Sequence, residues 1–303
     1  MMEDMCIGNL PFRGWPNPFH AALCLTWDVD DEAPFYSRGI SPYHDVSEIE
    51  QRQYGVRRAL PLIFNLLQKS RVPACFFVPA YIAKQWPAVI QTLADHQYEI
   101  GGHGFLHEPV RNLAIQDEDD IVREALTVLR KISRQPVVGY RTPSWQFNTW
   151  TPEVLRRYGI LYDSSLMGDI SVYQLAWDTG QPLLEIPIHW NLDDVEHWGH
   201  THATRDHSIS SPSTVYEIWK DELLGIVNQG GVCVLTLHPH VSGRPGFLSV
   251  IQRFIDFAQS IPDLWITTPG HIAQYVSAHA LTVPRVRLAS TMPDTQYGRE
   301  PAP

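Results

Sequence analysis

Short apolar runs alternate with longer segments of helical periodicity along most of this chain of 303 residues. The apolar runs are bounded by turn residues, which is typical of buried strands, and the longer segments repeat apolar positions at helical spacing. We predict strands at 21–28, 74–80, 98–104, 137–143, 161–166, 183–190, 232–239 and 264–269, and helices at 48–69, 84–97, 117–133, 213–228, 246–260 and 269–278, with a further helix that begins at Thr151. Strands that alternate with crossover helices indicate a parallel sheet.

The number of strand–helix repeats, about seven, predicts an α/β fold built as one distorted (β/α)7-type barrel with insertions in its rim loops. No internal repeat and no Gly/Ser linker divides the chain into two domains. We therefore expect a barrel domain at 1–280. The segment 281–303, rich in Pro and Arg, is expected to be a C-terminal extension on the surface or against an oligomer neighbour.

Composition narrows the classes of partner. Hydrophobic residues make up 44% of the chain and charged residues 18%, which excludes disorder as the main state. The net charge of −10 argues against nucleic acid as a partner. No apolar run is long enough to cross a membrane. The N-terminus carries Glu3 and Asp4 where an export signal would be basic, so we predict a cytoplasmic protein.

The cysteines show no metal-binding or disulfide pattern. They stand at Cys6, Cys24, Cys75 and Cys233, without any CxxC spacing. We expect buried thiols in a reducing compartment.

The chain holds 14 histidines, more than a core of this composition needs. Polar side chains lie at the ends of four predicted strands: Asp28 to Glu32 at the end of the first, His103 and His107 at the end of the third, Arg141 at the end of the fourth, and His238 at the end of the strand at 232–239. Barrel enzymes place their chemistry at this end of the strands. We therefore expect these side chains to share one rim.

His103 and His107 are four residues apart, which lets both imidazoles point at one ion. Together with an Asp-rich strand end they predict a two-His, one-carboxylate metal site with positions left for water and substrate. The alternatives for the DVDD segment are a solvated acidic loop, a nucleotide-sugar transferase or an aspartyl phosphotransferase. A nucleotide-sugar transferase would leave the two histidines without a role. An aspartyl phosphotransferase requires a Thr or Val after a DxDG nucleophile motif, whereas Asp31 and Glu32 follow here.

The ordered motifs TWDVDDE, GGHGFLHE, YRTPSW, WNLDD and LTLHPH span 26–240. In this set the chain resembles the polysaccharide deacetylase, or NodB-homology, superfamily. One residue separates the two aspartates of the first motif, as in the branch of small peptidoglycan-deacetylase-like proteins, cyclic imide hydrolases and allantoinase-like enzymes.

The resemblance implies a role for each residue. Asp28 would be the general base, and Arg141 would keep it ionised. His238 would protonate the leaving nitrogen, oriented by Asp193 or by the alternative Asp194. The metal ligands would be Asp30, His103 and His107. They would hold one divalent ion: zinc first, with cobalt, nickel or iron as alternatives.

Further residues are expected around the pocket. Trp145, Trp190 and Tyr43 are candidates for substrate contact, and a backbone N–H near Trp145 is a candidate to bind the oxyanion. The His-rich segment 196–208 is expected to be a loop over the pocket, because its spacings fit no fixed metal geometry.

The predicted function is metal-dependent hydrolysis of an amide or imide C–N bond outside peptides. A small cyclic imide or amide is the favoured substrate, and the alternative is N-deacetylation of N-acetylglucosamine units in peptidoglycan or chitin-type glycans. An alternative of another class is a non-catalytic ligand-binding barrel, and a metal-free reaction as in allantoinase-like relatives is disfavoured because all three ligand positions are filled. The branch also implies a homo-oligomer, with a tetramer as one form.

Overall fold

The computed structural model describes residues 12–40, 43–111, 113–176, 181–201 and 208–288. One curled sheet forms its centre, with the strand order β10-β6-β7-β5-β4-β3-β2-β1-β8 and with β9 also paired to β1. The strands are β1 (Ala21–Asp28), β2 (Cys75–Val78), β3 (Glu99–Gly102), β4 (Gly139–Tyr140), β5 (Tyr162–Asp163), β6 (Tyr173–Ala176), β7 (Leu183–Glu185), β8 (Val232–Leu237), β9 (Leu264–Thr267) and β10 (Arg285–Arg287). Every pair is parallel except β6 with β7.

Strand β1 organises the sheet because both of its edges are used. One edge pairs with β8 from Ala22 to Trp27. The other edge pairs with β9 near its start and with β2 near its end. The free edge of β8 forms a single parallel bridge from Thr236 to Asp193. The sheet therefore curls into a half-barrel, and the predicted α/β barrel class is confirmed.

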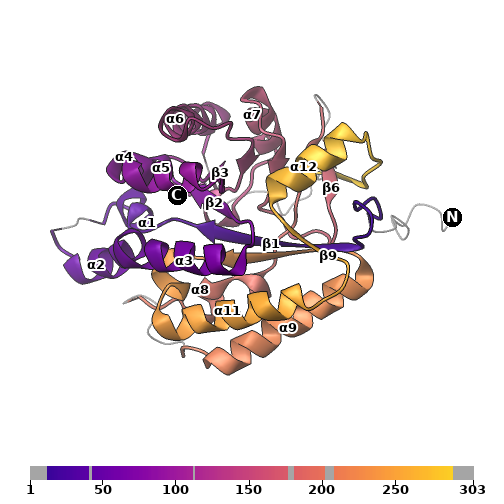
Figure 1. Ribbon diagram of the computed structural model, residues 1–303. Helices are drawn as coiled ribbons and strands as arrows, with labels where there is room; N and C mark the ends of the chain where they lie inside the picture. Colours follow the sequence, from indigo (N-terminus) through magenta and orange to yellow (C-terminus); the bar gives the residue numbers. More distant parts are fainter. Residues whose placement is uncertain (1–11, 41–42, 112, 177–180, 202–207, 289–303) are drawn as a thin grey trace, which may run out of the picture.

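Helices cover the outside of this sheet. Their bounds are α1 (Ala33–Ser37), α2 (Val46–Tyr54), α3 (Leu60–Ser70), α4 (Ala80–Gln85), α5 (Pro87–Asp95), α6 (Ile115–Ser133), α7 (Thr151–Arg157), α8 (Asp194–Trp198), α9 (Pro212–Gln229), α10 (Pro239–Ser242), α11 (Pro245–Gln259) and α12 (Pro269–Ala278). In Figure 1, α3, α9 and α11 lie below β1 and β9, and α6, α7 and α12 lie above. Most of the apolar core lies between these helices and the strands, as the periodicity predicts.

The helix predicted at 48–69 differs from the prediction. A π-helical turn, Gly55–Ala59, separates α2 from α3. The Asp31 carboxylate lies against this turn and accepts the Val56 N–H at 3.0 Å. A Cβ added at Gly55 would lie 2.0 Å from Asp31 Oδ1. An inserted side chain of this kind is a known cause of such bulges, and only glycine leaves room for it.

The helix predicted at 84–97 is two helices, because α4 ends at Gln85 and α5 begins at Pro87. Proline lacks the N–H that would continue the first helix. The 3₁₀ turns Pro143–Trp145 and Trp190–Leu192 follow β4 and β7. They shorten the strands predicted at 137–143 and 183–190.

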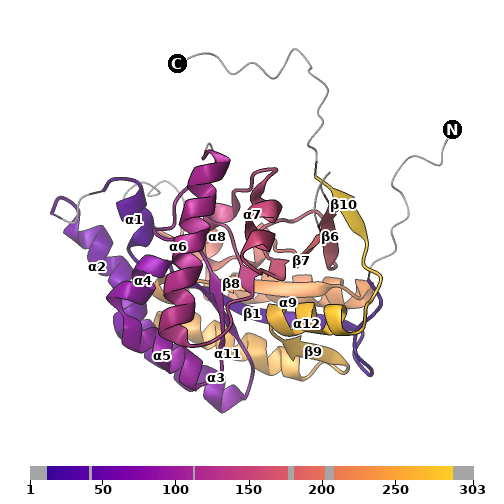
Figure 2. The ribbon, with the colours of Figure 1, turned by 90° about the horizontal axis from the view of Figure 1, so that it is seen from above.

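The start of the C-terminal extension joins the sheet. Figure 2 shows β10 beside β6 at one edge, where Val286 pairs with Leu175. Val283 is buried just before this strand. The part of the extension at 289–303 lies outside the described residues.

Three of the four cysteines fall in the described residues, and all three are buried free thiols, as predicted: Cys24, Cys75 and Cys233. Cys6 lies outside the described residues. None of the described helices has the length and apolar character that a membrane crossing requires.

Candidate active site

The polar residues predicted at the strand ends meet at one rim of the half-barrel. Asp28 is the last residue of β1, Arg141 directly follows β4, and His238 directly follows β8. The side chains concerned are all nearly buried: Asp28, Asp30, His103, His107, Arg141, Asp193, Asp194 and His238. Eight polar side chains withdrawn from water in one place need either partners or a ligand.

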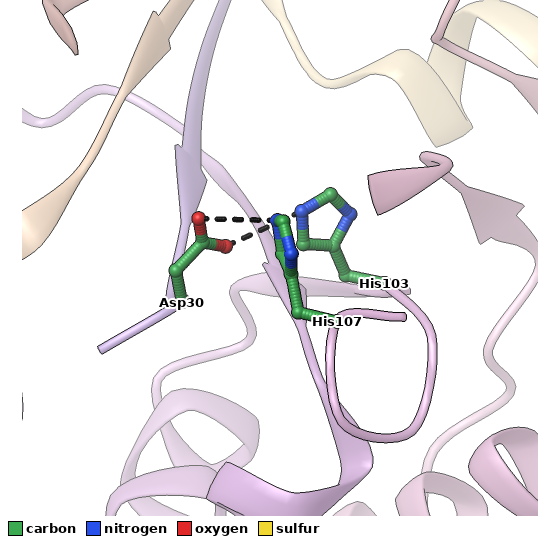
Figure 3. A group of neighbouring side chains, drawn as sticks. All are labelled: Asp30, His103 and His107. Carbon is green, nitrogen blue, oxygen red and sulfur yellow. Dashed lines mark ion pairs between the residues drawn. The ribbon is translucent and has the colours of Figure 1, made fainter. Parts of the chain in front are cut away.

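Asp30, His103 and His107 form a compact cluster in which the carboxylate faces both rings (Figure 3). His103 Nε2 lies 3.3 Å from Asp30 Oδ1, and His107 Nε2 lies 3.3 Å from Asp30 Oδ2. The two ring centroids are 4.9 Å apart. His107 reaches this position because the loop after β3 turns through two left-handed residues, Gly104 at φ +71° and His107 itself at φ +57°.

The protonation of this cluster suits a cation. The His103 Nδ1–H donates to the Arg141 carbonyl at 2.7 Å, which leaves Nε2 facing Asp30; burial lowers the pKa of His103, but Asp28 and Asp30 raise it above its usual value. Burial lowers the pKa of His107 to about 4, so its ring is neutral near pH 7. Burial would raise the pKa of Asp30, yet that pKa lies well below its usual value because His107 and His103 face the carboxylate.

A divalent ion fits these donors. Oδ1 of Asp30 is buried and has no hydrogen-bond partner among the described residues. Two imidazoles and one carboxylate are a known catalytic donor set for zinc. Ligand atoms about 2.0–2.1 Å from a tetrahedral zinc lie about 3.3 Å from one another, which matches the spacing seen here. We take Asp30, His103 and His107 as the candidate metal ligands.

Asp28 lies beside this cluster and is held by Arg141. Its Oδ1 accepts a hydrogen bond from Arg141 Nη1 at 2.7 Å, and its Oδ2 is 3.9 Å from His103 Nε2. The guanidinium is fully buried, stacks over Phe77, and also donates to the Ser164 carbonyl at 2.8 Å. A buried cation so fixed orients the neighbouring carboxylate.

His238 is oriented by Asp194 rather than by Asp193, the residue we placed first. Asp194 Oδ1 lies 2.7 Å from His238 Nδ1, and Asp194 Oδ2 accepts the His238 backbone N–H at 2.8 Å. Asp193 Oδ1 is 3.8 Å from the same ring nitrogen. The Asp193 carboxylate instead caps α8 by accepting the Val195 N–H at 2.7 Å. Because Asp193 caps α8, its carboxylate lies farther from the imidazole, and Asp194 is the aspartate that faces the ring.

The two aspartates make His238 strongly basic. Burial lowers the pKa of a histidine, but Asp194 and then Asp193 raise the pKa of His238 to about 10. Burial in turn raises the pKa of Asp193 to about 8. His238 Nε2 lies 3.7 Å from Asp30 Oδ2. A protonated imidazole therefore stands next to the candidate metal site.

One cavity of about 290 Å³, here called the reaction cavity, brings these groups to a common space. Trp145 and Trp190 line it with ring centroids 4.2 Å apart. Tyr43 is not among the residues that line it, and this side chain is 89% exposed in the turn before α2, so its assignment as a substrate contact stays a prediction. The Trp145 N–H donates to the Thr142 carbonyl at 3.0 Å, so this N–H is already used within the 3₁₀ turn.

Arg38 and Arg52 also line the reaction cavity, and sequence reasoning missed both. They lie after α1 and on α2, outside every motif, so no spacing signal pointed to them. The His-rich segment is described only in part, because 202–207 lie outside the described residues. Within it, His197 makes a 3.0 Å hydrogen bond to the Asn191 carbonyl.

Known proteins resemble this chain over most of its length. The family model for polysaccharide deacetylase matches residues 53–162, which include His103, His107 and Arg141. The peptidoglycan deacetylase of Helicobacter pylori is 25% identical over 235 residues, 69% of this chain and 80% of the relative. A crystal structure of a candidate polysaccharide deacetylase from Mycobacterium smegmatis has a TM-score of 0.86 and 33% identity, covering 94% of this chain and 98% of the other. A crystal structure of an allantoinase has a TM-score of 0.78 and 22% identity over 90% of this chain and 96% of the other, and so shares the fold.

Proposed function

Because this chain belongs to the polysaccharide deacetylase family of hydrolases, we propose that it hydrolyses a non-peptide amide or imide bond with the help of one divalent ion. The ion would be held by Asp30, His103 and His107. The observation that carries the proposal is that a carboxylate, Asp28, and an imidazole, His238, flank this ligand set inside one cavity. When bound, the ion would polarise the carbonyl and acidify a water molecule.

Asp28 is the proton acceptor in this proposal. Its Oδ2 is not used by Arg141, which is bonded to Oδ1, and it faces the ligand His103. Arg141 holds the carboxylate in position through this charge-assisted hydrogen bond. Asp28 would take a proton from the attacking water.

His238 is the proton donor. Asp194 accepts a hydrogen bond from Nδ1, and because the pKa of His238 is raised to about 10 the ring is an imidazolium whose second proton is on Nε2, 3.7 Å from Asp30 Oδ2. Protonation of the leaving nitrogen is what makes C–N cleavage productive near neutral pH. Removal of the Asp194 carboxylate would leave this proton less firmly held and the ring less well oriented.

Two substrates have separate support. The reaction cavity of about 290 Å³ favours a compact cyclic imide or amide, since pockets for small ligands begin near this size. The relatives described as deacetylases favour an N-acetylated amino sugar. The catalytic groups required are the same for both.

The test is a substrate panel on zinc-loaded and chelated protein. Succinimide and maleimide are followed by ring opening, and N-acetylated chitooligosaccharides by released acetate. We expect turnover of one class by the loaded protein and its loss on chelation. The Asp28→Asn variant is the matched control for contaminating activity. Absence of turnover on every compound, with one zinc bound per chain, would contradict the proposal.

A further inference from the structure

A second cavity of about 1030 Å³, here called the side cavity, adjoins the reaction cavity. The two share the lining residues Arg38, Arg52, Val195 and Glu196. Because the same side chains border both spaces, a ligand in one can extend into the other. The combined space is larger than a compact cyclic imide requires.

The side cavity is lined by cationic side chains in a chain that is acidic overall. Three arginines, Arg38, Arg52 and Arg244, line it, whereas Glu196 is the acidic residue among its described lining. The whole chain has a net charge of −10. Arginines gathered in one concave place against that background create a local field that favours an anion.

The two arginines shared by the cavities make no close ion pair. Within the described ranges, neither Arg38 nor Arg52 has a carboxylate within 4.0 Å. Arg52 stacks over Phe35 and donates to the Asp31 backbone carbonyl at 3.4 Å. Burial lowers the pKa of Arg52, Asp30, Asp31 and Glu48 raise it, and the charge of Arg38 lowers it. The net lowering indicates that these carboxylates do not fully compensate the buried guanidinium, which an anion in direct contact would stabilise.

A buried imidazole in the same cavity also lacks a partner. His240 lines the side cavity, is 6% exposed, and its Nδ1 has no hydrogen-bond partner in the part of the chain that the structure describes. Arg244 is held in place by stacking over the Tyr54 ring, with its guanidinium carbon 3.7 Å from the ring centroid. An unsatisfied buried polar atom costs stability unless a ligand completes it.

We propose that the side cavity binds a carboxylate of the substrate through Arg38 and Arg52, while the bond to be cleaved lies at Asp30, His103 and His107. The planar guanidinium fork matches the two oxygens of a carboxylate. This inference rests on the proposed function and deepens it: the substrate class becomes an amide or imide that carries a carboxylate.

The test is a binding experiment that needs no turnover. Acetate and the dicarboxylates from malonate to adipate are titrated calorimetrically into zinc-loaded protein. Acetate is too short to occupy both cavities, whereas a dicarboxylate of suitable length can place one end in each. We expect at least one dicarboxylate to bind tenfold or more tightly than acetate.

Substitutions then show which residues cause the preference for a dicarboxylate over acetate. In the Arg38→Gln, Arg52→Gln double variant the tenfold preference should disappear while bound zinc stays at one per chain, which reports that the fold and the metal site are intact. Arg38→Gln alone serves if the double variant does not fold. Arg134→Gln removes an exposed arginine at the end of α6 and is the charge-matched control for the single variant; it should keep the preference.

The outcomes are distinct from those of the substrate panel. The proposal is overturned if no dicarboxylate exceeds acetate by tenfold, or if the double variant keeps the preference. An intact preference without turnover of any amide would refute the proposed function and leave the carboxylate site standing.

Discussion

Replacement of Asp194 by asparagine should separate the two adjacent aspartates by function. The Asp194 carboxylate accepts two hydrogen bonds from His238, at 2.7 and 2.8 Å. Asparagine can keep one of them through its amide oxygen and loses the other. A hydrogen bond to a charged group contributes about 1.5–3 kcal/mol, so the free energy of unfolding should fall by about that amount.

The loss in catalysis should exceed this loss in stability. Without the carboxylate, the positive charge on His238 is less stabilised and Nδ1 faces an amide that can donate instead of accept. General acid catalysis contributes about 10²–10⁴-fold, so kcat for Asp194→Asn should fall by that factor. The metal content should stay near one per chain, because Asp194 is not among the candidate ligands.

Asp193→Asn is the matched control. Its carboxylate is 3.8 Å from His238 Nδ1 and caps α8. Asparagine is as good an N-cap residue as aspartate, so stability should hardly change and kcat should fall less than tenfold. The assay is kcat, bound metal and urea unfolding on all three proteins. Equal losses in the two variants, or an Asp194→Asn enzyme within threefold of wild type, would refute this reasoning.

Three further substitutions test other parts of the site. Asp28→Asn should lower kcat by about 10²–10⁴-fold with metal retained, because the amide cannot accept the proton; loss of metal instead, measured by mass spectrometry, would make Asp28 a ligand. Trp190→Ala should raise KM and leave kcat nearly unchanged, because this half-exposed ring lines the cavity without touching the proton donors; steady-state kinetics that show a fall in kcat alone would contradict it. Glu185→Gln should flatten the pH dependence of stability. Burial raises the pKa of Asp163 to about 6 and that of Glu185 well above 4.5, so the folded state holds extra protons and stability falls from about pH 4 upward by as much as about 1.4 kcal/mol per pH unit for each of the two groups. Urea unfolding at pH 5, 6 and 7 measures the slope, and an unchanged slope would count against the explanation.

The strand-end residues could be predicted because parallel strands bring their carboxyl ends to one rim. Asp28, His103, Arg141 and His238 come from four strands far apart in sequence, yet one edge of the curled sheet collects them. To predict that these side chains lie together, only the correct order of strands along the chain was required. The fold class and the candidate ligand set followed from that order and from the motifs.

Other features depend on local geometry that periodicity does not encode. The roles of Asp193 and Asp194 follow from the residue at which α8 begins, and a boundary is uncertain by one or two residues in any sequence pattern. Arg38 and Arg52 line the cavity from positions after α1 and on α2, outside every motif and every strand end, so no pattern in the sequence pointed to them. Short strands such as β6 and β10 give too few alternating positions to be recognised.

The central claim is that one divalent ion at Asp30, His103 and His107 supports the hydrolysis. Its most direct test is to add zinc in steps to chelated protein and to measure bound metal and hydrolytic rate on the same samples. We predict that the rate rises in proportion to bound zinc and stops rising at one ion per chain, and that His107→Ala abolishes both. Full hydrolytic activity in a sample shown to contain no metal would contradict the account.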